Sequence, residues 1–407
     1  MTGVTLAEAC LAIVDCEHKT APADPQGECF AVGTPAMRGN RIDYGEARQV
    51  SRTTFESWTR RLRPQFGDLL LAREAPVGPV VRIPEHLRVA PGQRTVLLRP
   101  DPACIDSLFA YYLITSPGQQ VRLLQKAEGS TVPHLNVADV RSFELPTLPP
   151  IEEQRGIAAT LGALDDKIES NRRQIAIANE LADELWGTIA GAPTNRYSID
   201  DLAASGTLLL SDGYRTRVDQ LGEPGMTILR VADIADDHFA VRPDADHILD
   251  TYAPKYREKM SMAGDVVVTT KGTVGRAALV GPDDVPAVYS PQICFIRALD
   301  RYRLSPAALY RWVRSDDFRS QALEVQHQTD MAAYVSLSDF RRFKLPVADP
   351  EAQELTKIES LDLLIAAGRR ETGTLQATRD TLLPELLSGR IRVPEAREAL
   401  AETMVFV

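Results

Sequence analysis

The sequence has few cysteines, and they form no recognisable pattern. They are odd in number and none belongs to a CxxC pair: Cys10, Cys16, Cys29, Cys104 and Cys294. Cys16, His18 and Cys29 could contribute to a zinc site, but no nearby residue completes a tetrahedral set. Buried, reduced thiols are the simpler interpretation.

Long apolar runs are also absent. The first twenty residues read MTGVTLAEACLAIVDCEHKT, in which Glu8 interrupts a short apolar stretch with no basic residues before it. A signal peptide has a basic lead, and a membrane-spanning helix needs about 20 apolar residues. We therefore expect a folded, cytoplasmic protein, and a length of 407 residues predicts two or more domains.

An excess of positive charge is missing too. The formal net charge is −10 at pH 7, which argues against a protein that coats nucleic acid non-specifically. The charge is uneven, however, because residues 38–73 contain eight arginines and only four acidic residues. A DNA-reading surface in this stretch is compatible with the acidic average.

No catalytic motif is visible. The chain has neither a GxxxxGK[ST] phosphate loop nor the Asn/Asp-Pro-Pro-aromatic tetrapeptide of adenine methyltransferases. The glycines of TTKGTVG, residues 269–275, fit a turn between strands. The stretch YREK, residues 256–259, lacks the spaced acidic partner of a nuclease site and fits a charged surface turn. We expect no catalytic residues, no metal site and no bound cofactor in this chain.

The strongest positive feature is an internal repeat with an offset near 200 residues. FGDLLLAREAPVGPVVRI (66–83) shares its pattern of Gly-Asp, apolar run, polar step and Val-Gly with AGDVVVTTKGTVGRAALV (263–280). VADVRSFELP (137–146) likewise matches LSDFRRFKLP (337–346). One large unit is therefore duplicated in tandem. Short β-branched runs, Gly/Pro turns and helical segments within each copy predict an α+β domain.

A long helix is predicted after each copy, just beyond Pro149-Pro150 and Pro350, because apolar residues there recur in alternating steps of three and four. The expected pairing residues are Leu161, Leu164, Ile168, Asn171 and Ile175 in the first helix and Ile358, Leu361 and Ile365 in the second. Asn171 is aligned with Gly368 of the repeat. It either fixes the register against a small partner or marks a frayed edge, and Arg379 indicates fraying or a buried stem with an exposed head.

At these residues the chain resembles the specificity subunits of type I restriction–modification systems. The most specific marks are LPPIEEQRGIAATLGALDDKIESNRR (148–173) and TRDTLLPELLSGRIRV (378–393), and the resemblance covers nearly the whole chain. It implies two target recognition domains, each reading half of a split DNA site, separated by two antiparallel coiled-coil helices. The implied limits are 1–147 and 193–346 for these domains, 148–192 and 347–390 for the spacer helices, and 391–407 for a C-terminal tail.

The resemblance also implies partners. These are double-stranded DNA, two methylation subunits and, optionally, two motor–nuclease subunits, with S-adenosylmethionine and Mg-ATP expected on the partner subunits. The second helix departs from the family pattern, since Asp349-Pro350 replaces Pro149-Pro150, and Gly368 and Gly373 weaken it by up to about 1 kcal/mol each. This departure puts the symmetry of partner binding in doubt.

Candidate DNA-binding residues lie in polar, turn-like segments flanked by strands, where arginine or lysine could reach guanine or phosphate and glutamine could reach adenine. In the first copy they are His18, Lys19, Thr20, Arg38, Arg41, Arg48, Arg52, Arg60, Arg61 and Arg73. In the second they are Tyr214, Arg215, Arg217, Thr270, Lys271, Gln328 and Tyr334. Each segment could equally be a solvated loop.

Two other functions stay open at this point. A stand-alone DNA-modifying enzyme would need the motifs that are missing. A coiled-coil scaffold that never touches DNA would leave the duplicated domains and the arginine-rich stretch without a purpose.

Overall fold

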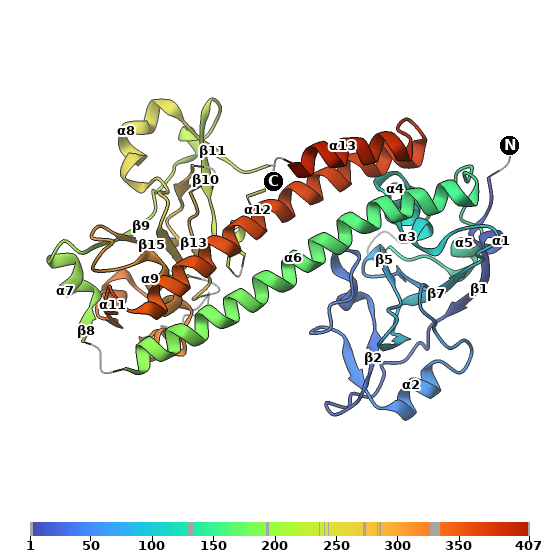
Figure 1. Cartoon of the computed structure of the whole chain (residues 1–407), viewed down its shortest axis with the longest axis horizontal. Helices are drawn as coiled ribbons and strands as arrows, with labels where there is room; N and C mark the ends of the chain where they lie inside the picture. Colours follow the sequence, from blue (N-terminus) through green and yellow to red (C-terminus); the bar gives the residue numbers. More distant parts are fainter. Residues whose placement is uncertain are drawn as a thin grey trace. The chain divides into compact units, whose positions relative to one another are not determined.

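The computed structural model describes residues 3–405 except 128–132, 193–194, 236, 240, 243, 272–273, 283, 285 and 326–333. The chain divides into two compact units, unit 1 (Met1–Glu169 with Thr372–Val407) and unit 2 (Ser170–Glu371). Two long helices, α6 (Ile151–Gly191) and α12 (Gln353–Ser388), run through this division. Each unit therefore combines one globular domain with half of each long helix (Figure 1).

The domain of unit 1 is built on a four-stranded antiparallel sheet in the order β1-β7-β4-β5. Its strands are β1 (Cys10–Asp15), β4 (Leu69–Arg73), β5 (Val77–Arg82) and β7 (Thr95–Pro100). A second sheet contains β2 (Cys29–Val32), β3 (Arg48–Val50) and β6 (Arg88–Pro91). The helices are α1 (Leu6–Ala9), η1 (Thr34–Asn40), α2 (Arg52–Trp58), α3 (Ser107–Thr115), α4 (Pro117–Lys126) and α5 (Val137–Arg141).

Strand β4 shows how the layers form. Successive side chains of a strand point to opposite faces of its sheet, so Leu69 and Leu71 enter the core shared with α3 and the long helices. Leu70 and Ala72 point the other way and pack against Val32 of the second sheet. The apolar run of β4 is continuous because both faces of this sheet are covered.

Unit 2 repeats this arrangement. Its four-stranded sheet, β9-β15-β12-β13, contains β9 (Leu208–Asp212), β12 (Asp265–Thr269), β13 (Ala277–Leu279) and β15 (Ile293–Ala298). The second sheet contains β10 (Gly225–Leu229), β11 (His247–Leu249) and β14 (Val288–Tyr289), and β8 (Arg196–Ser198) pairs with β16 (Lys344–Pro346). The helices are α7 (Ile199–Ala204), α8 (Ala253–Tyr256), α9 (Pro306–Arg314), α10 (Asp316–Val325) and α11 (Leu337–Phe340). Short 3₁₀ turns follow at η2 (Val218–Gln220), η3 (Val231–Asp233), η4 (Asp250–Tyr252) and η5 (Arg257–Lys259).

The duplication extends to buried side chains. Arg99 donates to both carboxylate oxygens of Asp68, at 3.0 and 2.7 Å. In unit 2, Arg297 binds Asp265 in the same two-point manner, at 2.7 Å for both bonds. A buried carboxylate is tolerated when a cation and hydrogen bonds compensate for its lost hydration, and the Gly-Asp step of the repeated motif places one such pair in each domain.

The long helices pack along their predicted seam. In unit 1 the first half of α6 shares a core with the last half of α12, including Leu161, Leu164, Leu382 and Leu386. In unit 2 the last half of α6 meets the first half of α12, so the helices are antiparallel. The predicted pairing residues Leu161, Leu164, Ile168, Asn171, Ile358 and Ile365 are buried, and Ile175 and Leu361 are half-buried.

The predicted fold class, an α+β chain with two duplicated domains and two long antiparallel helices, is confirmed. The segment that we expected to be a tail contains a further helix, α13 (Val393–Val405). Its Ala396 is buried in the core of unit 1, and Val393 lies against Gly156 of α6. The helix α13 therefore packs on the helix pair.

Candidate nucleic-acid interface

The end of β1 carries a compact polar cluster in unit 1. His18 Nε2 lies 3.0 Å from Asp15 Oδ2, and Arg73 Nε lies 3.3 Å from Asp15 Oδ1. Arg73 also donates to the Leu135 carbonyl and approaches His18 Nδ1. These contacts orient the imidazole ring with Nε2 toward the Asp15 carboxylate and Nδ1 toward the Arg73 guanidinium. Arg73 is thus a positioning residue for the exposed His18.

Several of the predicted arginines are held by carboxylates. Arg60 and Arg61 both lie against Glu17 Oε1, at 3.1 and 3.4 Å, and Arg61 also donates to the Cys16 carbonyl. Arg52 pairs with Glu56 along α2, and Arg41 pairs with Glu169 of α6. The pair of Arg60 and Arg61 therefore adds about one net positive charge to the surface, since Glu17 offsets the other.

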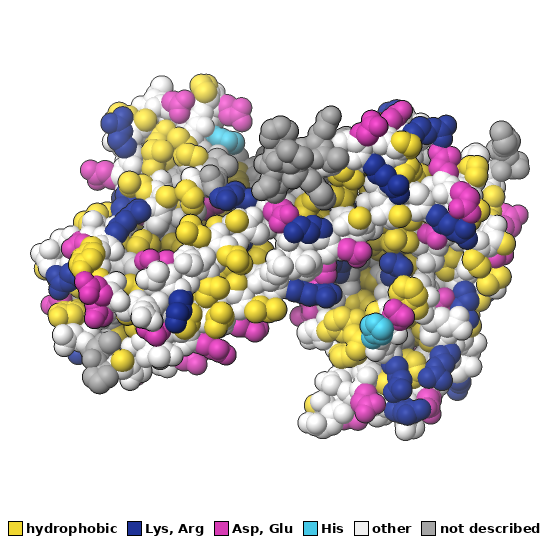
Figure 2. Space-filling model, viewed as in Figure 1, with side chains coloured by type: hydrophobic (Ala, Val, Ile, Leu, Met, Phe, Trp, Pro, Cys, Tyr) yellow, Lys and Arg dark blue, Asp and Glu magenta, His cyan; other side chains and the backbone are white. Residues whose placement is uncertain are grey.

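Lys19, Arg38 and Arg48 differ from these residues. All three are exposed, and no hydrogen bond or ion pair joins their side-chain nitrogens to any other described residue. Thr20 beside them contacts Gln93 at 3.4 Å. Figure 2 shows lysine and arginine side chains gathered on the part of unit 1 that carries α2. Cations without a protein partner are the ones best suited to replace counterions on a phosphate backbone.

In unit 2 the loop after β9 presents aromatic and basic side chains. Tyr214 is fixed by its backbone bond to Tyr289 and by a 3.3 Å bond from its hydroxyl to the buried Gln220. Its ring packs edge-on against Tyr256. Arg215 and Arg217 are exposed, and no ion pair ties them to another residue of the described chain. The loop thus presents two exposed cations beside a packed pair of tyrosine rings.

Lys259 holds the end of β9, where that loop begins. Its ammonium group donates to Ser211 Oγ at 2.6 Å, to the Asp212 carbonyl at 2.9 Å and to Asp212 Oδ1 at 3.3 Å. The YREK segment therefore supports a neighbouring loop. Sequence reasoning missed this role, since Lys259 and Asp212 are far apart along the chain.

Two of the predicted segments meet just beyond the end of β12. Lys271 forms an antiparallel bridge with Tyr334, and Val335 N donates to the Thr270 carbonyl at 2.9 Å. Unit 1 has the same bridge between Glu74 and His134. The remaining candidate, Gln328, lies outside the described residues.

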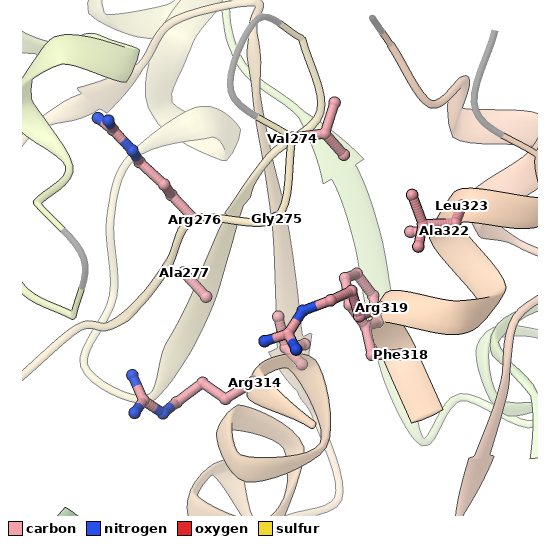
Figure 3. Close-up of a pocket in the computed structure, with 10 residues that line it drawn as sticks. Val274, Gly275, Arg276, Ala277, Arg314, Phe318, Arg319, Ala322 and Leu323 are labelled. Atoms are coloured by element: carbon pink, nitrogen blue, oxygen red, sulfur yellow. The ribbon is translucent and has the colours of Figure 1, made fainter. Parts of the chain in front are cut away.

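A pocket of about 550 Å³ is lined in part by the residues that follow the Lys271 segment (Figure 3). It lies between residues 274–277 and helices α9 and α10, with Val313, Phe318 and Ala322 among its apolar lining. Three arginines that we did not predict also line it: Arg276, Arg314 and Arg319. Arg314 is held by Asp183 and Arg319 by Asp316. The third arginine, Arg276, follows directly after the predicted TTKGTVG turn, so its position in the sequence could have identified it as a candidate.

Cysteine and metal chemistry are not prominent in the described chain. Cys16 and Cys29 are buried free thiols, and burial raises the pKa of Cys16. Within the described residues, no three potential metal ligands of the His, Cys, Asp and Glu types lie together. Nor does any helix there have the length and apolar character needed to cross a membrane.

Comparison with known proteins gives a consistent result. The family described as "Type I restriction modification DNA specificity domain" matches residues 59–179. The type I restriction enzyme MjaVIII specificity subunit of Methanocaldococcus jannaschii is 20% identical over 309 residues, which cover 71% of each chain. The MjaIX specificity subunit of the same organism is 30% identical over 145 residues, covering 36% of this chain and 32% of that protein.

A similar fold is also known from a solved structure. The S subunit of a type I restriction–modification system from M. genitalium superposes with a TM-score of 0.58. The match covers 95% of this chain and 96% of that chain at 16% identity. At this identity the likeness bears on the fold, and it extends over both domains and both long helices.

Proposed function

We propose that this chain, which belongs to the specificity subunits of type I restriction–modification systems, reads a bipartite DNA site and directs partner subunits to it. Each target recognition domain reads one half of the site, and the helix pair sets the gap between the halves. The observation that carries this proposal is the duplication, because the same two-sheet domain occurs twice with separate loops of exposed cations. Two readers on one chain suit a site with two specified halves.

Catalysis is assigned to the partners. A methylation subunit would supply S-adenosylmethionine and transfer a methyl group to adenine, and a motor–nuclease subunit would use Mg-ATP for restriction. The chain itself contributes binding: phosphate contacts from unpaired cations give affinity, and contacts to base edges give sequence preference. A subunit that acts on DNA with these partners is expected to work in the cytoplasm.

An apolar surface on the helix pair of unit 2 suits a methylation subunit. Ile177 and Leu181 of α6 and Leu363 and Leu364 of α12 are exposed. Leu181 also lines a groove of about 750 Å³ together with Leu185, Lys357 and Leu361. Large exposed apolar side chains on neighbouring helices are typical of protein–protein contacts. We assign this surface to one of two methylation subunits.

The test is reconstitution followed by sequencing of methylated DNA. The purified chain, a methylation subunit from the same system, and the two together would each be incubated with genomic DNA and S-adenosylmethionine. Only the mixture should methylate adenine, at a single two-part motif. Methylation by the chain alone would establish a DNA-modifying enzyme, and a mixture that methylates without sequence preference would point to a scaffold.

A further inference from the structure

The two domains are attached to the helix pair by different chemistry. In unit 1, Tyr112 of α3 donates its hydroxyl to Asp165 Oδ2 of α6 at 2.6 Å. Arg379 of α12 donates to the other oxygen, Asp165 Oδ1, at 2.8 Å. We call these three residues the first anchor. Its cation comes from the helix pair, and the domain supplies a neutral hydroxyl.

In unit 2, Arg311 of α9 replaces the hydroxyl. It donates from Nη1 to Asn179 Oδ1 and to Asp183 Oδ1, both at 3.0 Å, and from Nη2 to Asp362. Its side chain is 0% exposed. We call Arg311, Asn179, Asp183 and Asp362 the second anchor. Here the cation comes from the domain and the helix pair supplies carboxylates.

The two anchors occupy equivalent positions of the repeat. Helices α3 and α9 align with Tyr112 on Arg311 and with Ser116 on Ser315. Along the seam, Leu164-Asp165 aligns with Leu361-Asp362, and Arg379 aligns with Ala182, which is fully buried. The position that carries a helix arginine in unit 1 therefore carries alanine in unit 2, where the domain provides the arginine instead.

The carboxylates of the two anchors therefore receive their cations from different parts of the protein. Asp165 has its cation within the helix pair, on Arg379, which also contacts the exposed Asp380 at 2.7 Å. Asp183 and Asp362 have their cations on the domain, because Arg311 contacts both and Arg314 also contacts Asp183 at 3.1 Å. Asp362 is only 11% exposed, and a carboxylate buried to this degree is strongly destabilising when it loses its cation. The domain of unit 1 offers Tyr112 and Thr115 where these two arginines stand.

We propose that the two anchors form a charge key that determines which domain each half of the helix pair accepts. The half in unit 1 accepts a domain with a hydroxyl donor at the second turn of its anchoring helix. The half in unit 2 accepts only a domain with arginine there. The order of the two domains along the chain is then fixed by the helix pair. This key concerns folding, so it does not depend on the proposed DNA function.

The proposal can be tested in the full-length chain by giving the first anchor the charge arrangement of the second. Arg379→Ala leaves the half-exposed Asp165 without its cation, and Tyr112→Arg adds a second cation beside Arg379, so each single change should lower the thermal midpoint by a few degrees. Together they reproduce the chemistry of the second anchor, with the domain supplying the only cation. The double variant should therefore melt well above the midpoint expected from adding the two losses. A double variant whose loss of thermal midpoint equals the sum of the two single losses would overturn the proposal.

A substitution in the second anchor and a matched control complete this experiment. Arg311→Tyr should lower the midpoint, because Asp183 and Asp362 both lose the guanidinium that they contact. The control is Arg341→Tyr, which removes an exposed pair with Asp200. It should change the midpoint by only a degree or two, as expected for a surface ion pair. An equal loss for Arg341→Tyr and Arg311→Tyr would count against the key.

A domain duplication provides the second measurement. In one chimera, residues 193–346 are replaced by a copy of residues 1–147. In its partner, that copy also carries Tyr112→Arg and Thr115→Arg. The chimera with the two changes should give more soluble protein and a higher unfolding midpoint than the unchanged copy. Equal behaviour of the two chimeras, folded or not, would show that the key does not control docking.

Discussion

The side-chain amide of Asn171 on α6 donates a 2.9 Å hydrogen bond to Glu371 Oε2 on α12. Asn171 is 1% exposed, so it is a buried polar contact of the seam rather than a frayed edge. Its partner is a carboxylate and not the glycine with which it aligns in the repeat. Gly368 instead lies against Ile175, whose Cγ1 would be 3.2 Å from an added Cβ.

Asn171→Ala should destabilise the chain by about 1–2 kcal/mol, because Glu371 loses one hydrogen-bond donor at a buried position. Urea unfolding followed by circular dichroism measures this loss. Ser170→Ala is the control, since Ser170 is the exposed neighbour on the same helix turn and should behave like the parent. A parent-like Asn171→Ala would mean that the hydrogen bond contributes nothing to seam stability.

The two glycines of α12 should respond differently to alanine. Nothing lies within 4 Å of an added Cβ at Gly373, so Gly373→Ala should gain the full helix-propensity difference of about 1 kcal/mol. Gly368→Ala should gain less, because its Cβ presses on Ile175. Thermal unfolding of the two variants side by side tests this order. A larger gain at position 368 would show that the seam is looser there than the contact indicates.

The domain of unit 2 is also joined to α12 through Asp237, which lies 2.5 Å from Arg369. Burial opposes the ionised form of this carboxyl, but the hydrogen bond from His238 and the charge of Arg369 prevail and lower its pKa to about 2. A lowered folded-state pKa stabilises the fold above the unfolded value near 3.8, and this stability is lost as the pH falls toward 2. Asp237→Asn should therefore remove up to roughly 2 kcal/mol at pH 6 and much less at pH 2. A loss that is equal at both pH values would assign the stabilisation to packing.

DNA binding should depend most on the exposed cations that have no partner among the described residues, such as Arg38 and Arg48. Arg38→Ala with Arg48→Ala should lower the slope of log affinity against log salt by about 1.8, if each arginine meets one phosphate. Arg60→Ala with Arg61→Ala should lower it by less, since Glu17 already offsets one of these charges. Fluorescence anisotropy of the complex with the proposed methylation subunit, at several salt concentrations, measures both slopes. A larger decrease in slope for the Arg60 and Arg61 variant would show that Glu17 moves away from these arginines when DNA binds.

Features that repeat along the sequence could be predicted, and features that depend on distant partners could not. The Gly-Asp motifs revealed the duplication because Asp68 and Asp265 each hold the same strand-to-strand geometry with an arginine. The alternating steps of three and four revealed the helix seam. The arginine-rich stretch, by contrast, did not reveal which cations are free, because Glu17 and Glu169 are remote in sequence from the arginines that they bind.

The helix pair is expected to set the distance between the two half-sites. Contacts divide between residues 169 and 170 of α6 and between residues 371 and 372 of α12, so an insertion there leaves each domain on its own helix half. Since the helices are antiparallel, matched insertions of one heptad are needed at both points to preserve the seam. Seven residues add roughly 10 Å of helix, equivalent to about three base pairs.

The half-site sequences should stay unchanged in this variant, because neither domain nor its anchor is altered, while the unspecified gap between them lengthens. Sequencing the methylated sites of the reconstituted variant and the parent measures both quantities. A control with the heptad inserted in α6 alone should fail to methylate, because one half of the seam then loses its register. Altered half-sites with an unchanged gap would show that the helices do not set the spacing.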